Sequence, residues 1–215
     1  MIDTLPYRTI ILANGEMPTH PIAMEMLRKA DTIICCDGAV RHLEKLQLQP
    51  TVIVGDGDSI PAEIRKRYAD RISPDKCQEY NDLTKAFHYA AKHNLSPVAI
   101  LGAMGLRDDH AFANLSLLMR HARSTRVVMV TNYGIFTPIS SSTVFRSHKG
   151  EAVSVFSFTP ATRLTFSGLR YPVEKRSFAE LWEGSLNESL GDQFGIELCD
   201  EGEILVYQAF QKENL

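Results

Sequence analysis

Residues 51–59 read Thr-Val-Ile-Val-Gly-Asp-Gly-Asp-Ser, and this stretch shows both the kind of strand and the kind of loop that build the chain. Its apolar half, 51–54, is short, rich in Ile and Val, and does not alternate with polar residues. Such a run is typical of a strand buried on both faces of a parallel sheet. Its polar half places two carboxylates directly after the strand, where ligands bind in open α/β sheets.

Runs of the same kind recur through the first two-thirds of the chain, at residues 9–13, 32–36, 98–101 and 127–130. Stretches with helix-like patterns lie between and after them, at 21–29, 40–46, 61–68, 82–93 and 109–121. Repeated strand–helix–strand units predict an α/β fold. We expect residues 1–132 to form a doubly wound domain with a mostly parallel, Rossmann-like sheet.

The pattern changes near Asn132. Short strand-like pieces separated by turn signals follow it, at 135–139, 143–146, 152–158, 163–166, 197–199 and 204–210. We expect a C-terminal antiparallel β-sandwich domain over residues 133–215. Residues 178–190 are compatible with a strand, a helix or a loop, and Trp182 within them is expected to pack.

Composition excludes several classes of protein. The chain has 215 residues and a formal net charge of −3, which gives no electrostatic reason to expect nucleic acid as a partner. Its start lacks the basic n-region and the long apolar h-region of a signal peptide, and its apolar runs are too short to cross a bilayer. We expect a cytoplasmic protein without a membrane partner, whose four cysteines are reduced, buried thiols.

Carboxylates collect at the predicted strand ends. Asp37 follows the run at 32–36, Asp56 and Asp58 follow the run at 51–54, and Asp82 opens a predicted helix. Clustered carboxylates repel one another unless a cation lies among them, and Mg²⁺ prefers hard oxygen ligands. This pattern favours a magnesium site. The alternative is a solvated acidic turn that caps the helix beginning near Pro61.

A second loop joins the run at 98–101 to the next predicted helix. Gly102 and Gly105 give it flexibility, and the N–H groups of such a loop favour phosphate. Arg107 adds bidentate donors for an anion, and His110 opens the helix beyond. The alternative is a helix capped by Asp109 beside a surface arginine. The loop matches neither a Walker A motif nor a dinucleotide fingerprint.

Asp82 and Lys85 lie three residues apart at the start of a predicted helix. This spacing fits an ordinary surface ion pair, which contributes little. It fits equally a carboxylate on a metal and an ammonium group on a phosphate, so both interpretations stay open.

Taken in order, these segments resemble the thiamine pyrophosphokinase family over almost the whole chain. The matching segments are residues 12–15, 36–39, 54–59, 81–86, 102–110, 114–115, 167–172 and 185–187. The sequence departs from the family pattern at Ala39, where a second glycine is common, and at Leu106, where the pattern has Gly-Gly-Arg. It also has Asn81 where threonine often precedes the aspartate. Leu106 is the least conservative change, and it bears on how the loop contacts the nucleotide.

The resemblance implies roles for particular residues. The Mg²⁺ ligands would be Asp56, Asp58 and Asp82, and these three with Arg107 would be the catalytic residues. The ATP-binding residues of the α/β domain would be Asn14, Asp37, Gly38, Lys85, Gly102, Gly105, Arg107, Asp109 and His110. Thiamine would lie between the two chains of a homodimer, bound through the β-sandwich domain by Tyr171, Ser185 and Asn187.

The resemblance also implies the reaction, in which the hydroxyl of thiamine attacks the β-phosphorus of ATP and AMP leaves. Two alternatives remain. One is a phosphatase of the haloacid dehalogenase type with Asp56 as nucleophile, although in that family the D-x-D motif follows the first strand rather than the third. The other is a nucleotide-binding sensor that performs no chemistry.

Overall fold

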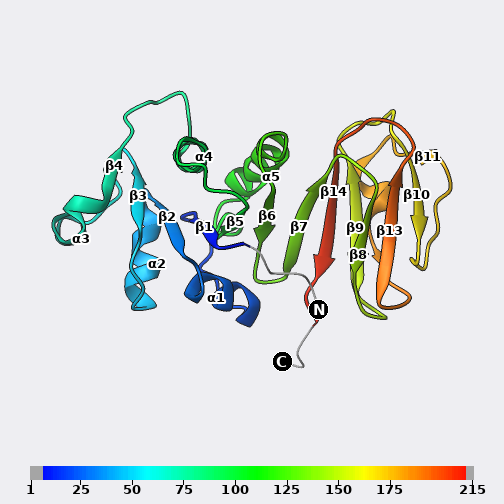
Figure 1. The fold of residues 1–215 in the computed structure, drawn as a ribbon, viewed down its shortest axis with the longest axis horizontal. Helices are drawn as coiled ribbons and strands as arrows, with labels where there is room; N and C mark the ends of the chain where they lie inside the picture. The colour runs from blue at the N-terminus through cyan, green and yellow to red at the C-terminus, as the bar shows by residue number, and fades with distance from the viewer. Residues whose placement is uncertain (1–6, 212–215) are drawn as a thin grey trace. The chain divides into compact units, whose positions relative to one another are not determined.

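The computed structural model describes residues 7–211. The described chain divides at Tyr133 into two compact units, one formed by residues 7–132 and the other by residues 133–211 (Figure 1). Each unit has its own secondary structure and its own core, so each is described separately.

The N-terminal unit contains a parallel sheet. Its strands are β1 (Thr9–Leu12), β2 (Thr32–Cys36), β3 (Val52–Gly55), β4 (Ile72–Pro74), β5 (Val98–Leu101) and β6 (Val127–Val130). Their order is β4-β3-β2-β1-β5-β6, and every pairing is parallel. The strand order reverses at β1, which pairs with both β2 and β5. This reversal is the switch point at which open α/β sheets bind ligands, and it confirms the predicted fold class.

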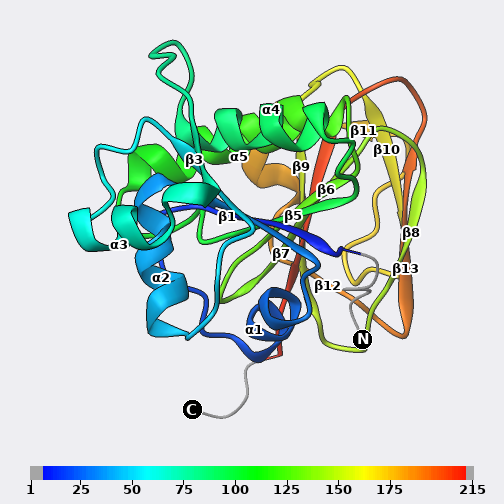
Figure 2. The ribbon, with the colours of Figure 1, turned by 60° about the vertical axis from the view of Figure 1, so that its left-hand side comes forward.

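Helices cover both faces of this sheet. They are α1 (Pro21–Arg28), α2 (Val40–Lys45), α3 (Ala62–Arg67), α4 (Asp82–Lys92) and α5 (Asp108–Ala122). Figures 1 and 2 show α4 and α5 on one face and α1 and α2 on the other. Helix α4 packs on β2 and β3 and buries Leu83, Ala86, Phe87 and Ala90, which share one helical face.

Two features of this unit differ from the sequence-based expectation. Strand β4 was not predicted, because its three residues are half-buried or exposed and form no apolar run. Helix α5 starts at Asp108 and has Arg107 at its N-cap, so the alternative that Asp109 caps this helix is wrong.

The C-terminal unit is a sandwich of two antiparallel sheets. Its strands are β7 (Gly134–Ile139), β8 (Thr143–Arg146), β9 (Ala152–Ser157), β10 (Arg163–Ser167), β11 (Arg176–Ser177), β12 (Asn187–Glu188), β13 (Gln193–Leu198) and β14 (Ile204–Ala209). One sheet has the order β12-β9-β14-β7 and the other β11-β10-β13-β8. Side chains from both sheets form one apolar core, which includes Phe145, Phe166, Phe178 and Phe194. The predicted antiparallel sandwich is confirmed.

The ambiguous segment 178–190 holds little regular structure. A single turn of 3-10 helix, η3 (Leu181–Gly184), precedes the two-residue strand β12. The side chain of Trp182 is 72% exposed, so the expectation that it packs within the chain is wrong. All four cysteines are free thiols, as expected; Cys35 and Cys36 are buried, but Cys77 and Cys199 are only half-buried, so the expectation that all four are buried is wrong. Among the described residues, no helix has the length and apolar character needed to cross a membrane.

One buried histidine, His121, leads us to expect that acid destabilises the N-terminal unit. The ring of His121, on α5, stacks on Phe87 with ring centroids 3.8 Å apart, and its buried Nε2 has no hydrogen-bond partner among the residues that the structure describes. Burial, with smaller contributions from Arg120 and His88, lowers the pKa of His121 to about 4.

This lowered pKa predicts how stability depends on pH. Between about pH 6.5, the ordinary value, and the folded pKa near 4, the unfolded chain binds a proton that the folded chain does not. Stability is therefore lost as pH falls through that window. We expect the melting temperature of His121→Phe to decrease less between pH 7.5 and 5 than that of the wild type. His93→Gln, which removes an exposed histidine, is the control, and an equal decrease in all three proteins would contradict this prediction.

Candidate active site

Three carboxylates converge beyond the carboxyl ends of neighbouring strands. Asp37 begins the short 3-10 turn η1 (Asp37–Ala39) after β2, and Asp56 and Asp58 follow β3. One oxygen from each carboxylate lies within 4.8 Å of the other two. They meet because β2 and β3 are adjacent parallel strands, so the residues that follow them emerge at the same edge of the sheet.

Burial differs sharply within this group. Asp37 is only 2% exposed, whereas Asp56 is half-buried and Asp58 is exposed. Burial raises the pKa of Asp37, and the carboxylates of Asp82, Asp56 and Asp58 add to that effect, while a hydrogen bond from the Ser59 amide opposes it. In the described part of the chain, Asp37 Oδ1 is buried without a hydrogen-bond partner. A buried, unpaired oxygen among carboxylates suits a small divalent cation.

Glycines make this convergence possible. A Cβ atom at Gly55 would lie 2.8 Å from the Cβ atom of Asp37, so a side chain there would push the two loops apart. Gly57, between the two aspartates, has a φ angle of +83°, a conformation that residues with a side chain rarely adopt. At Gly38 a Cβ atom would lie 2.6 Å from Asn14 Nδ2, so the β1 loop also packs against η1.

Asp82 and Lys85 form a partly buried pair at the start of α4. Lys85 is only 4% exposed, and its Nζ lies 3.3 Å from Asp82 Oδ1. The alternative of an ordinary surface pair is therefore wrong. Burial raises the pKa of Asp82, Lys85 partly offsets this, and the charges of Asp56 and Asp58 add to it. Asp82 lines the same cavity as Asp56, although the compact set of carboxylates contains Asp37 in its place.

A cavity of about 530 Å³ opens beside these residues within the N-terminal unit. Its volume falls in the range of sites for small molecules and cofactors. Most of the expected ATP- and metal-binding residues line it: Asn14, Asp56, Asp82, Lys85, Gly102, Gly105, Arg107 and His110. Asp58, Asp37, Gly38 and Asp109 are not among the lining residues that the structure identifies.

The loop between β5 and α5 forms one wall of the cavity. Hydrogen bonds to its carbonyl groups hold it: Gly15 N donates to Gly102 O at 2.6 Å and Asn114 Nδ2 donates to Ala103 O at 2.7 Å. Leu106 has a φ angle of +62°, uncommon for a residue with a side chain, and is 79% exposed. The conformation at Leu106 is the kind that glycine adopts easily, consistent with the glycine that the family pattern has there.

Arg107 has a carboxylate partner beside the cavity. Its Nε and Nη2 donate to the two oxygens of Asp109, at 3.1 and 2.6 Å. This bidentate contact lowers the pKa of Asp109 to about 2. Both side chains are exposed, so the pair is accessible to an anion that competes for the guanidinium group.

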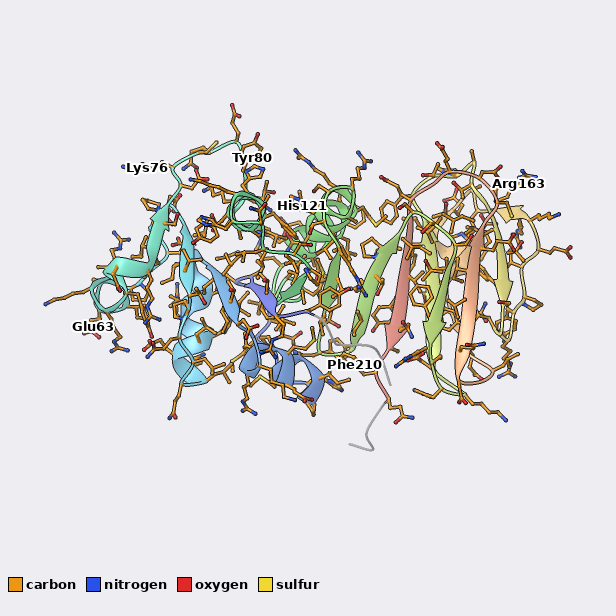
Figure 3. All side chains as sticks on the ribbon, in the orientation of Figure 1. Glu63, Lys76, Tyr80, His121, Arg163 and Phe210 are labelled. Atoms are coloured by element: carbon orange, nitrogen blue, oxygen red, sulfur yellow. The ribbon has the colours of Figure 1, made fainter. Side chains whose placement is uncertain are left out.

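Sequence reasoning missed two residues that line the cavity, Gln78 and Tyr80. Gln78 Nε2 lies 3.4 Å from Asp56 Oδ2, and the ring of Tyr80 meets His88 edge to face at 4.9 Å. Figure 3 labels Tyr80 on the segment that leads into α4. The segment has no apolar periodicity, so only the fold reveals that it borders the site.

The expected thiamine-binding residues lie in the C-terminal unit, and two of them are joined. Asn187 Oδ1 accepts from the backbone N–H of Tyr171 at 3.0 Å, and Asn187 Nδ2 donates to the Tyr171 carbonyl at 2.8 Å. The ring of Tyr171 is 59% exposed, with the guanidinium carbon of Arg170 at 5.9 Å from its centroid. Ser185 Oγ instead donates to the carbonyl of Trp182 at 2.6 Å.

The fold and site define the class of protein: a doubly wound α/β unit with a carboxylate-rich cavity at its strand ends, followed by an antiparallel β-sandwich. Family models agree with this class. One described as "Thiamin pyrophosphokinase, catalytic domain" matches residues 23–130, and one described as "Thiamin pyrophosphokinase, substrate-binding domain" matches residues 134–207.

Relatives and solved structures agree with the family models. Thiamine pyrophosphokinase 1 of Oryza sativa subsp. japonica is 26% identical over 201 residues, which cover 79% of this chain and 75% of that protein. A thiamine pyrophosphokinase structure from Bacillus subtilis has a TM-score of 0.81 at 18% identity, covering 94% of this chain and 99% of that one. A thiamin pyrophosphokinase structure from Candida albicans gives 0.79 at 18% identity, covering 95% and 90%. At these identities the structures show a shared fold.

The chain belongs to the thiamin pyrophosphokinase family. It is therefore an enzyme, a thiamine diphosphokinase, which uses ATP to convert thiamine into thiamine diphosphate. Family membership does not favour the two alternatives, a phosphatase and a sensor without activity.

Proposed function

We propose that Asp37, Asp56, Asp58 and the adjacent Asp82 hold Mg²⁺, and that the neighbouring cavity binds ATP. The observation that carries this proposal is the buried Oδ1 of Asp37, which has no hydrogen-bond partner among the described residues, in a set with Asp56 and Asp58 from which one oxygen each lies within 4.8 Å of the others. The donors are all carboxylate oxygens, the ligand type that Mg²⁺ prefers. Mg²⁺, when bound, would neutralise charge on the phosphate oxygens of ATP.

The chain's own cationic groups would align the phosphates. Lys85 is buried at the cavity wall, so its ammonium group is held in one place. Arg107 supplies a planar pair of donors, which are bound to Asp109 in this structure. If phosphate replaces Asp109 as their acceptor, the guanidinium group stays paired with an anion. The N–H groups of the 102–107 loop and of the α5 start add further donors. Such a transfer depends chiefly on alignment and charge neutralisation.

In the proposed reaction the hydroxyl oxygen of thiamine forms a bond to the β-phosphorus of ATP. The bond from that phosphorus to the oxygen bridging the α- and β-phosphates breaks, and AMP leaves with this oxygen. The hydroxyl proton passes to a base. Incubation with thiamine, ATP and Mg²⁺ is expected to give AMP and thiamine diphosphate in equal amounts. Formation of ADP, or release of AMP at the same rate without thiamine, would contradict this reaction.

We further propose that residues 1–132 form the ATP- and Mg²⁺-binding domain and residues 133–215 the thiamine-binding and dimerisation domain. The hydrogen-bonded pair of Tyr171 and Asn187, with the exposed Tyr171 ring and the nearby Ser185, supports the second role. We place the enzyme in the cytoplasm, because free cysteines suit a reducing compartment.

Replacing Tyr171 by Ala tests the thiamine site. An aromatic face can stack on a cationic ligand, a contact worth about 0.5–2 kcal/mol. We expect Tyr171→Ala to weaken thiamine binding by about 2- to 30-fold, which is that energy expressed as affinity, while ATP binding stays nearly unchanged. Calorimetric titration with each substrate measures both. Tyr133→Ala, which removes another exposed tyrosine of the same unit, is the comparison variant. Unchanged thiamine affinity in Tyr171→Ala would contradict the assignment.

The homodimer can be tested by mixing two chains with different defects, at a thiamine concentration too low to saturate Tyr171→Ala. If each site takes Tyr171 from one chain and Asp58 from the other, a mixed dimer of Tyr171→Ala and Asp58→Asn chains has one site free of both changes. An isologous dimer, the commonest oligomer, would give such sites. We expect activity to recover on mixing. If subunit exchange is demonstrated and activity does not recover, each chain must build its own site.

A further inference from the structure

A single residue, Ser59, contacts two carboxylates of the acidic group, those of Asp37 and Asp58. Its backbone N–H donates to Asp37 Oδ2 at 3.0 Å, and its hydroxyl Oγ donates to Asp58 Oδ1 at 3.2 Å. The N–H of Asp58 in turn donates to Asp56 Oδ1 at 3.2 Å. The directions in which the Asp37 and Asp58 carboxylates point therefore depend on where the backbone of Ser59 is held.

The carbonyl group of Ser59 is held by Arg41. The Nη2 of Arg41, on α2, donates to Ser59 O at 2.8 Å. The same nitrogen would lie 3.4 Å from a Cβ atom placed on Gly38, so the guanidinium also packs against the turn that carries Asp37. Arg41 thus contacts both segments that supply the carboxylates, the η1 turn and the loop after β3.

We propose that Arg41 is a positioning residue of the metal site, which fixes Ser59 so that Asp37 and Asp58 face a common point. This inference rests on the proposed function, because it assumes that the acidic group holds a divalent cation. It adds a residue that the sequence motifs did not single out. Arg41 acts through Ser59: its guanidinium group donates a hydrogen bond to the Ser59 carbonyl and does not contact the metal itself.

The change in metal affinity on removing Arg41 separates a positioning role from a purely electrostatic one, because the two predict changes in opposite directions. A guanidinium near a cation site repels the cation, so removing its charge should tighten metal binding if Arg41 were only a neighbouring charge. If Arg41 positions the ligands, removing it should weaken metal binding. Changes to residues that orient metal ligands typically weaken affinity by about 10- to 100-fold.

The test is calorimetric titration of the full chain with Mn²⁺, without nucleotide or thiamine, so that the readout is metal affinity and not turnover. The variants are Arg41→Gln, which removes the charge and the fork of donors, and Arg41→Lys, which keeps the charge and one donor. Arg28→Gln, which removes an exposed arginine on α1, is the matched control. Thermal melts of every variant show that each is folded.

We expect Arg41→Gln to weaken Mn²⁺ binding by about 10-fold, Arg41→Lys to recover part of that loss, and Arg28→Gln to match the wild type. Unchanged or tighter binding in a folded Arg41→Gln protein would overturn the proposal. If in addition Arg41→Gln lost affinity for ATP measured without metal, Arg41 would be a direct phosphate contact instead. Failure of the wild type to bind Mn²⁺ would remove the metal site itself, and with it this role of Arg41.

Discussion

Asp58→Asn is expected to lower turnover by more than about 100-fold, the scale of a lost electrostatic contact in a transition state. The substitution keeps the size of the side chain and removes its charge. Asp58 is exposed, so no core packing is lost and the fold should remain intact. The turnover number at saturating ATP, thiamine and Mg²⁺, together with a thermal melt, measures both expectations.

Asp70→Asn is the matched control for this experiment, because Asp70 is another exposed aspartate of the same unit, on the 3-10 turn η2 (Ala69–Arg71). It should keep nearly full activity. A folded Asp58→Asn protein with activity near that of the wild type at saturating Mg²⁺ would show that this carboxylate is not needed, and the proposed metal site would have to be abandoned.

Lys85→Met should have an effect of similar size on catalysis. Methionine keeps the length and apolar stem of the side chain and removes the ammonium group that is buried at the cavity wall. We expect kcat/KM to fall by about 100-fold or more, because a cation fixed beside the phosphates stabilises the negative charge of the transition state. The variant should also raise the pKa of Asp82 further, since Lys85 is the group that lowers it.

Lys92→Met, an exposed position on the same helix, controls for the loss of a lysine from α4. Steady-state kinetics with ATP varied at saturating thiamine distinguishes the two variants. If Lys85→Met folded normally and kept its kcat/KM within a few-fold of the Lys92→Met value, the pair of Asp82 and Lys85 would be structural only.

Much of the N-terminal unit follows from its sequence, because strands buried on both faces need short runs of apolar residues. Strands β1, β2, β3, β5 and β6 all show such runs. Strand β4 does not, because it lies at the edge of the sheet and is only partly buried. Strands β11 and β12 have two residues each, too short for any pattern to reveal them.

The sequence was enough to predict where along the chain the candidate site lies, but not which of its side chains come together. The sequence placed Asp37, Asp56 and Asp58 after strands, and Asp82 at a helix start. Which of these carboxylates form the compact set depends on strand order, since β2 lies directly beside β3. The contacts of Ser59 with Asp37 and with Arg41 join residues 22 and 18 positions apart, and no local pattern encodes them.

The central claim is that the carboxylate group binds a divalent cation, and the most direct test is the affinity of the chain for Mn²⁺ measured by electron paramagnetic resonance without nucleotide. We predict a saturable site in the wild type and in Asp70→Asn, and an affinity lower by about 10-fold or more in Asp58→Asn. Equal affinity in all three proteins, or no saturable binding to the wild type, would contradict the claim.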